Sequence, residues 1–205
     1  MSNNTIVNDF AIKIANVNGT GSASANSMLS QVVFRMGIPV SGKNVFPSNI
    51  QGLPTWYEIR ANKDGFTGRI EEFSFLIAMN AQTYAQDVAS IVPGGYLLYD
   101  STWPNRKEFT REDITYIGIP LSELCNEKFE GSRTRTLMKN IAYVGAVAAL
   151  LNLDMEVIKE LLTEKFAKKG SLLELNFDAI KLGFDYAKEN IDCDLSIRYE
   201  KMQGT

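Results

Sequence analysis

FAIKIANVNGTGSASANSMLSQVVFRMGIPV, residues 10–40, is the stretch that decides the fold class. Residues 10–17 are mostly apolar, as expected for a buried strand, and they lead into a short polar turn with two glycines. Residues 23–36 carry apolar side chains at helical spacing, and Gly37 follows as an expected C′ residue. Residues 38–40 predict a second short strand. The order strand, glycine turn, helix, strand predicts the opening of a parallel α/β sheet.

The rest of the first two thirds of the chain continues this pattern. Apolar runs predict further strands over 55–61, 73–79, 96–99 and 114–119, and a helix is expected over 83–90. Residues 62–65 form a turn, after which residues 66–69 are expected to return as a hairpin partner. Residues 41–54 are expected to form a long polar loop, and loops of that length inside a compact domain are often functional.

The last third of the chain is helical in pattern. Helices are expected over 136–151, 155–166 and 171–190, and the first of these is so apolar that it belongs in the core, with Gly145 letting a neighbour approach. The predicted fold class is therefore α/β, a mostly parallel open sheet flanked by helices with a helical C-terminal part. We expect residues 1–205 to form one domain, in which 132–190 is mainly helical.

The composition excludes several function classes. The chain has 205 residues, a formal net charge of −3 and no histidine, so it contains no Ser-His-Asp triad and no histidine-ligated metal site. Its two cysteines, Cys125 and Cys193, form no Cys-x-x-Cys motif that would hold an iron–sulfur cluster, and each is expected to be a buried structural thiol. We therefore expect no metal ligands and no catalytic residue in this chain.

Charge and hydropathy also limit the partners and the location. Basic and acidic residues are intermixed without a basic stripe, so a nucleic acid is not an expected partner. Residues 1–8 carry no secretory signal pattern, and the longest apolar run, residues 141–151, is shorter than the roughly 20 residues that span a bilayer. We expect a cytoplasmic protein with no membrane partner and no disulfide.

Ligand-binding candidates come from the ends of the predicted strands, because open α/β sheets bind ligands beyond the carboxyl ends of their strands. Four polar stretches occupy such positions, residues 18–22, 41–44, 80–83 and 100–103. In the first, Gly19-Thr20-Gly21 opens a helix, so its backbone N–H groups would point at an anion. The local pattern fits equally well a plain strand-to-helix turn with Ser22 as the N-cap.

The second stretch, Ser41-Gly42-Lys43-Asn44, weighs against NAD as the ligand. An NAD site places an acidic residue here for the ribose, whereas this chain has Lys43, a good phosphate partner. Together the two stretches favour a phosphate-rich ligand, although Lys43 is also explained by simple solvation. A free-standing NADP-dependent oxidoreductase is the alternative. It is disfavoured because Ser24 stands where the dinucleotide motif has its third glycine. A scaffold without a ligand also stays open.

Four motifs resemble a known family. They are Asn18-Gly19-Thr20-Gly21-Ser22-Ala23, the run from Gly37 to Asn44, the run from Phe46 to Thr55, and Met138-Lys139-Asn140-Ile141. They are similar to the gamma domain of 2-oxoacid:ferredoxin oxidoreductases, above all to the form fused to the amino end of the alpha subunit in 2-oxoglutarate-type enzymes. The resemblance runs from about residue 10 to about residue 186.

The resemblance implies a role without chemistry of its own. The family converts a 2-oxoacid and coenzyme A to acyl-CoA, CO2 and reduced ferredoxin, and thiamine diphosphate and the iron–sulfur clusters lie in other domains or subunits. It implies that this chain assembles with alpha and beta subunits, meets ferredoxin only through the complex and is inactive in isolation, with 2-oxoglutarate rather than pyruvate as the expected substrate. By resemblance, the residues facing the CoA phosphates are Gly19, Thr20, Gly21, Ser22, Ser41, Lys43 and Asn44.

Two departures from the family pattern are visible. Many stand-alone gamma subunits carry Gly-Gly-Gln-Gly in the first turn, where this chain has Gly-Thr-Gly-Ser, so the phosphate geometry is expected to differ. The fused form continues into a thiamine-binding domain, whereas this sequence stops at Thr205. A separately encoded subunit and an excised domain both fit that ending.

Overall fold

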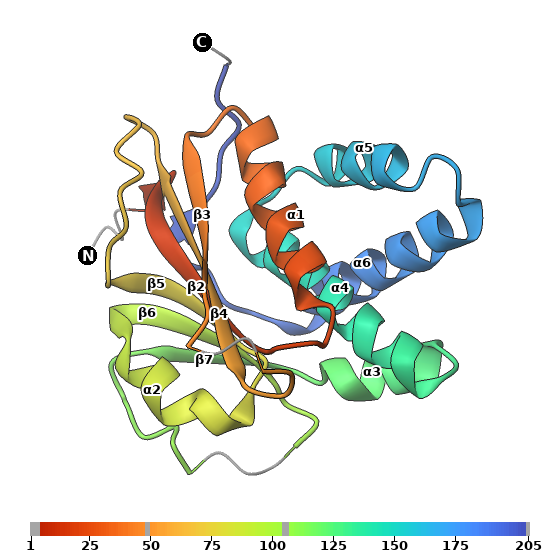
Figure 1. The fold of residues 1–205 in the computed structure, drawn as a ribbon. Coiled ribbons are helices and arrows are strands. Elements are labelled where there is room, and N and C mark those ends of the chain that lie inside the picture. The colour runs from red at the N-terminus through yellow and green to blue at the C-terminus, as the bar shows by residue number, and fades with distance from the viewer. Residues whose placement is uncertain (1–4, 48–49, 104–106, 204–205) are drawn as a thin grey trace.

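A computed structural model describes residues 5–47, 50–103 and 107–203 (Figure 1). Its main sheet has six strands: β2 Asp9–Val17, β3 Val40–Val45, β4 Pro54–Asn62, β5 Phe73–Ala78, β6 Ile91–Asp100 and β7 Thr115–Ile119. Two short strands, β1 Ile6–Val7 and β8 Ile197–Arg198, pair with each other. The helices are α1 Ser22–Arg35, α2 Tyr84–Ala89, α3 Leu121–Lys128, α4 Ser132–Leu151, α5 Met155–Lys165 and α6 Gly170–Asn190, and a 3-10 turn covers Ala81–Thr83.

The sheet is mostly parallel, as the sequence predicts. Its order is β3-β4-β2-β5-β6-β7, and β2, β5, β6 and β7 run parallel. β4 is antiparallel to both of its neighbours, so β3 points in the same direction as β2 but is separated from it by one strand. The expected fold class, α/β with an open sheet and a helical C-terminal part, is confirmed.

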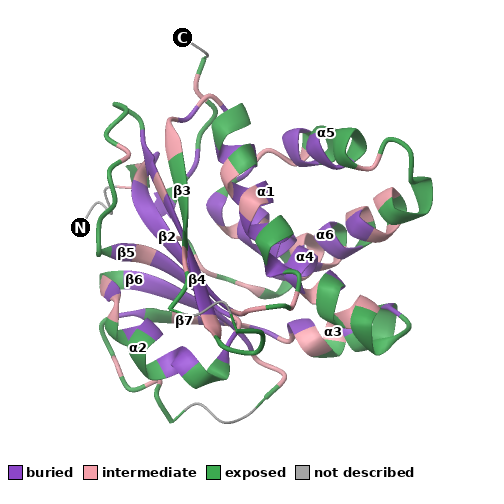
Figure 2. Ribbon diagram, viewed as in Figure 1, coloured by how far each residue is buried: buried purple, intermediate pink, exposed green. Residues whose placement is uncertain are grey.

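Helices cover both faces of the sheet, and the two layers differ in thickness. Figure 1 shows α1, α4, α5 and α6 stacked on one face, whereas α2 lies on the other. On the thick side, alternate β2 residues such as Ile12 and Ile14 pack against apolar side chains of α1 and α4. Figure 2 shows that α4 is buried along most of its length, which follows from its apolar sequence. No helix within the described residues is both long and apolar enough to cross a bilayer.

Two expectations about local structure were wrong, one helix was missed and one strand is longer than expected. Residues 41–44 do not follow a strand but lie inside β3, because hydrogen bonding to β4 extends that strand to Val45. Residues 66–69 form no strand; instead they cross the sheet face, where Thr67 accepts a hydrogen bond from Ser41 at 2.6 Å and Arg69 pairs with Glu58. The short helix α3 was not predicted, and β6 begins five residues earlier than the apolar run, at Ile91.

Two glycines set the distance between α4 and α6. A Cβ atom built on Gly145 of α4 would lie 1.9 Å from the backbone oxygen of Ile180, and one on Gly183 of α6 would lie 1.9 Å from that of Ala142. Those distances are far inside van der Waals contact, so the two backbones touch directly. The sequence-based expectation that Gly145 lets a neighbour approach closely is confirmed.

We predict that Gly145→Ala destabilises the fold by about 2 kcal/mol or more, because the two helices must separate to admit the methyl group. The measurement is chemical denaturation followed by circular dichroism. The matched control is Gly170→Ala at the start of α6, where a Cβ would meet nothing within 4 Å. That variant should be neutral or slightly stabilising, because alanine favours the helix. Equal stability of the two variants would contradict the close packing.

Candidate functional site

The glycine turn, residues 18–21, connects β2 to α1 at the carboxyl edge of the sheet. Gly19 and Gly21 both have positive φ angles, +87° and +81°, which favour glycine over any side-chain-bearing residue. The turn is held on one side by the chain segment before β4, since Asn18 N–H donates to Leu53 O at 2.9 Å and Gly52 N–H donates to Asn18 O at 3.0 Å. On the other side, Asn140 of α4 donates to Thr20 O at 2.9 Å.

The start of α1 contradicts one detail of the plain-turn interpretation. Gly21, not Ser22, is the N-cap residue, so the alternative with Ser22 as a side-chain cap is wrong. Within the described residues the N-cap makes no side-chain hydrogen bond, and the first turn of α1 carries no acidic residue. The first N–H groups of the helix therefore keep their hydrogen-bonding capacity and the positive end of the helix dipole, an arrangement suited to an anion.

A buried polar network lies directly beneath the turn and fixes the direction of α1. Asn26 of α1 accepts hydrogen bonds from Tyr143 of α4 and, at 3.5 Å, from Asn16 of β2. All three side chains are buried, and burial raises the pKa of Tyr143, so its hydroxyl stays a donor at neutral pH. The network joins β2, α1 and α4 where the turn begins, and it preorganises the backbone above it.

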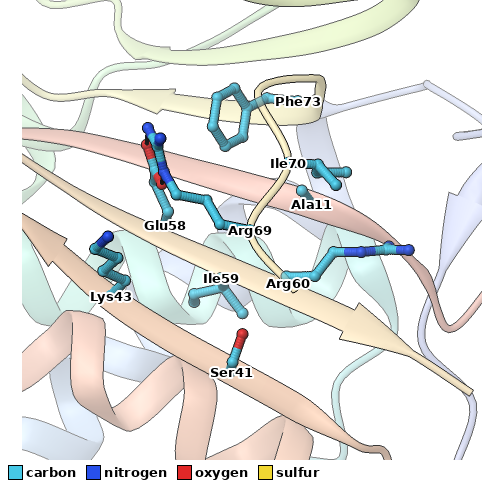
Figure 3. A pocket seen from close by; sticks show the side chains of 9 residues that line it. All are labelled: Ala11, Ser41, Lys43, Glu58, Ile59, Arg60, Arg69, Ile70 and Phe73. Carbon is cyan, nitrogen blue, oxygen red and sulfur yellow. Dashed lines mark hydrogen bonds and ion pairs between the residues drawn. The ribbon is translucent and has the colours of Figure 1, made fainter. Parts of the chain in front are cut away.

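The second predicted stretch, residues 41–44, lies elsewhere on the sheet. Ser41 and Lys43 project from the face that carries Glu58 and Arg69, as Figure 3 shows, and this is the face opposite to α1. Lys43 is exposed and lies opposite Glu58 of β4. Val17, the last residue of β2, lies opposite Pro54, which is four residues before Glu58 in β4. Two strand spacings and four residues place Val17 and Lys43 on the order of 16 Å apart.

The seven residues predicted to face CoA therefore fall into two groups. Gly19, Thr20, Gly21 and Ser22 lie together in the turn and the first residue of α1. Ser41, Lys43 and Asn44 lie in β3, an edge strand, and Asn44 is paired with Tyr57. One phosphate at the glycine turn does not reach Lys43.

Polar side chains after β5, in the third predicted stretch, make hydrogen bonds within the protein. After β5, Asn80 accepts a hydrogen bond from Gln82 N–H at 3.1 Å and so caps the short 3-10 turn. The nearby Asp87 is fully buried and accepts bonds from Trp56 at 2.8 Å and Thr83 at 2.6 Å. Burial raises the pKa of Asp87, and its position inside the layer keeps it away from any substrate.

The end of β6 brings Asp100, from the predicted stretch 100–103, together with residues of α3 and α4 that were not predicted to lie there. Asp100 accepts a hydrogen bond from Ser122 of α3 and lies 3.5 Å from the amine of Lys139 of α4. Lys139 stood in a family-like motif, but its position opposite Asp100 depends on how α4 packs, which no local signal shows. Both cysteines are free thiols: Cys125 is buried as expected, which raises its pKa to about 12, whereas Cys193 is only half-buried, against expectation. Among the described residues no acidic or thiol cluster is suited to a metal.

Comparison with known proteins gives one family. The family model described as pyruvate ferredoxin/flavodoxin oxidoreductase matches residues 11–186. Among curated proteins, the ketoisovalerate oxidoreductase subunit VorA of Methanothermobacter thermautotrophicus is 23% identical over 185 residues, which cover 90% of this chain and 38% of that protein. Subunit alpha of 2-oxoacid:ferredoxin oxidoreductase 2 of Aeropyrum pernix is 21% identical, covering 88% of this chain and 34% of its own length.

Solved structures agree with that result. The 2-oxoglutarate:ferredoxin oxidoreductase of Magnetococcus marinus, solved with 2-oxoglutarate, coenzyme A and succinyl-CoA, matches with a TM-score of 0.84 and 27% identity over 96% of this chain and 34% of that chain. The gamma subunit of the keto/oxoacid ferredoxin oxidoreductase of Geobacter sulfurreducens matches with a TM-score of 0.70 and 17% identity, covering 87% of this chain and 98% of that chain. This chain thus spans about a third of the Methanothermobacter, Aeropyrum and Magnetococcus proteins, the long relatives, and nearly all of the Geobacter gamma subunit.

Proposed function

This chain belongs to the pyruvate ferredoxin/flavodoxin oxidoreductase family, and we propose that it is the gamma part of a thiamine-dependent 2-oxoacid:ferredoxin oxidoreductase. Its role is to contribute to coenzyme A binding and to subunit assembly, with thiamine diphosphate and the iron–sulfur clusters held by the alpha and beta parts. The likeness to an enzyme solved with 2-oxoglutarate and coenzyme A supports 2-oxoglutarate as the substrate and succinyl-CoA as the product.

The observation that carries this proposal is the glycine turn at the point where the sheet changes direction. From β2 the chain crosses over α1 to β3 on one side, and from β5 it crosses over α2 to β6 on the other. The carboxyl ends of β2 and β5 therefore flank the switch point, the usual ligand crevice of an open α/β sheet. Gly19 to Ser22 place uncapped backbone N–H groups there, which suits the pyrophosphate of coenzyme A.

We predict that Ser24→Asp raises the KM for coenzyme A in the assembled enzyme about tenfold. Ser24 is exposed in the first turn of α1, so an added carboxylate repels the phosphates by about 1–4 kcal/mol at contact distance. The same carboxylate favours the helix N-terminus, so the fold is not expected to weaken. Gly21→Val is a poorer test, because it strains a positive-φ residue and its side chain would collide with Leu137 of α4.

The control is Ser24→Asn, which has nearly the same shape without the charge and should leave the KM for coenzyme A close to that of the parent. The KM for the 2-oxoacid should not change in either variant. A normal KM for coenzyme A in folded, assembled Ser24→Asp enzyme would leave the turn as a structural element and favour a scaffold role.

Lys43, with Ser41 and Asn44, is proposed to act on a different part of coenzyme A. Because Lys43 is too far from the turn to share its phosphate, its expected partner is the 3′-phosphate. Lys43→Ala should then raise the KM for coenzyme A about tenfold, since a charge-assisted contact contributes roughly 1.5–3 kcal/mol. Dephospho-CoA, which lacks that phosphate, should show no difference between parent and variant, and an effect that persists with it would assign Lys43 to another group.

Assembly is proposed to involve an apolar surface beside the glycine turn. Ile50, Leu53 and Leu137 are exposed by 36–65%. All three lie against the turn, since Asn18 donates to the backbone oxygens of Ile50 and Leu53, and Leu137 faces Gly21. Exposed apolar side chains gathered at one place, among polar neighbours, are typical of a protein interface. This chain spans only about a third of the long relatives, and this surface is a candidate contact for the alpha and beta parts.

We predict that Leu53→Asp weakens association with the alpha and beta parts while the chain itself stays folded, because the side chain is 39% exposed and only its backbone is hydrogen-bonded to the turn. Leu172→Asp is the matched control, since Leu172 is 38% exposed but lies at the start of α6, away from the turn. Size-exclusion chromatography of the mixed subunits reads the outcome. Equal assembly of the two variants would remove the surface around Leu53 from the interface.

The chain is proposed to be inactive by itself. It contains no histidine, and its described residues hold no metal-ligating cluster. Purified chain should therefore oxidise no 2-oxoacid with any acceptor dye, and activity should appear only when the alpha and beta parts are added. Turnover by the chain alone, freed of other subunits, would refute this.

A further inference from the structure

A pocket separate from the glycine turn opens at the carboxyl edge of the sheet, between α3 and the first two turns of α4. Its volume is about 220 Å³, and its lining contains two basic side chains, several hydroxyls and no acidic side chain among the described residues. The residues that matter are Trp103, Ser122, Ser132, Arg135, Thr136 and Lys139. Figure 1 shows α3 and the start of α4 side by side at this end of the molecule.

Lys139 is held in place by two polar partners, Ser122 and Asp100. Its amine donates to Ser122 Oγ at 3.2 Å and lies 3.5 Å from the buried carboxylate of Asp100. Asp100 is fixed in turn by the backbone N–H and hydroxyl of Thr102, at 3.2 and 2.7 Å. The carboxylate therefore orients the lysine, whose half-buried amine borders the pocket.

Arg135 adds a second cation that is anchored at only one edge. Its Nε donates to Phe129 O at 2.8 Å, and within the described residues its guanidinium forms no ion pair. The rest of the guanidinium can therefore turn to a ligand. α4 also begins here with Gly131 as the N-cap and no acidic residue in its first turn, so the helix dipole adds to the positive field.

The contact of Ser122 with a lysine and an aspartate raises the question of a nucleophile. Ser122 donates its proton to the carboxylate of Asp100 and accepts a hydrogen bond from the Lys139 amine at 3.2 Å, so both hydrogen-bonding roles of its hydroxyl are taken by structural partners. The neighbouring Cys125 stays a thiol, because burial raises its pKa to about 12. Covalent chemistry is therefore disfavoured, and charge recognition remains.

We propose that this pocket binds a phosphate group through Lys139, Arg135 and the hydroxyl of Ser132; the Thr136 hydroxyl donates to Ser132 O at 3.1 Å and only lines the pocket. Arginine recognises a phosphate by paired N–H donors and lysine by its point charge, which together match the two cations present. The exposed ring of Trp103 stands at the rim, where it would contact the remainder of a larger ligand. This pocket lies across α4 from the glycine turn, and its assignment does not depend on the role proposed for that turn.

The test uses inorganic pyrophosphate titrated calorimetrically into the 205-residue protein at low ionic strength, since screening weakens exposed charge pairs. Arg135→Ala should weaken binding about tenfold or more, and Arg135→Lys should recover part of that loss. Arg133→Ala is the matched control: it lies on the same turn of α4, removes the same charge and is exposed, but it does not line the pocket. It should change the dissociation constant by less than about twofold.

Lys139→Ala should weaken binding to a similar extent. If that variant unfolds, Lys139→Arg tests the contact with the phosphate instead, because its guanidinium still pairs with Asp100. Coenzyme A distinguishes two sources of the phosphate group. Competition between coenzyme A and pyrophosphate assigns the pocket to part of coenzyme A, and independent binding assigns it to a separate phosphorylated ligand. The proposal is overturned if the parent protein binds no pyrophosphate, or if Arg135→Ala and Arg133→Ala bind it equally.

Discussion

The contact between the backbones of α4 and α6 is the constraint on which the rest of the molecule depends. Gly145 and Gly183 each leave room for the other helix, so α6 lies directly on α4 and holds it against the sheet. At this contact backbone meets backbone, so no side chain can change its conformation to absorb a shift. A displacement of α4 would therefore open the core along the whole length of the helix. The direction of α4 is therefore fixed by a steric requirement far from either candidate site.

That direction matters because the first two turns of α4 build both anion-binding candidates. On one side Asn140 supports the glycine turn through Thr20, and on the other Lys139 meets Asp100 at the end of β6. Tyr143, one turn further, closes the buried network beneath α1. Adjacent residues of one helix thus position two separate parts of the carboxyl edge, which makes the geometry of the two sites mutually dependent.

The parts of the fold that sequence predicted well are those decided by short-range pattern. The strand β2, the glycine turn and α1 were placed within one or two residues, because a buried strand and an amphipathic helix have clear periodicities and the two glycines have positive φ. Even there the cap differed: the pattern suggested Ser22 as the N-cap, whereas the backbone geometry makes Gly21 the cap residue. The tight helix contact at Gly145 was also visible, since a lone glycine in an apolar helix usually reflects packing.

What the sequence did not predict depends on pairing between distant residues. Residues 41–44 have a glycine and three polar side chains, a poor strand signal, and they become β3 only because β4 returns antiparallel beside β2 and offers its free edge. The register of that pairing has a functional consequence. Lys43 pairs with Glu58, which lies opposite Lys13, so Lys43 is four residues short of the end of β2 as well as two strands away from it. The lysine is therefore distant from the glycine turn, whereas α4 brings Lys139 and Arg135 to the carboxyl edge of the sheet. The positive charge near the carboxyl edge is thus supplied by a helix of the C-terminal part, a rearrangement that no single stretch of the sequence reveals.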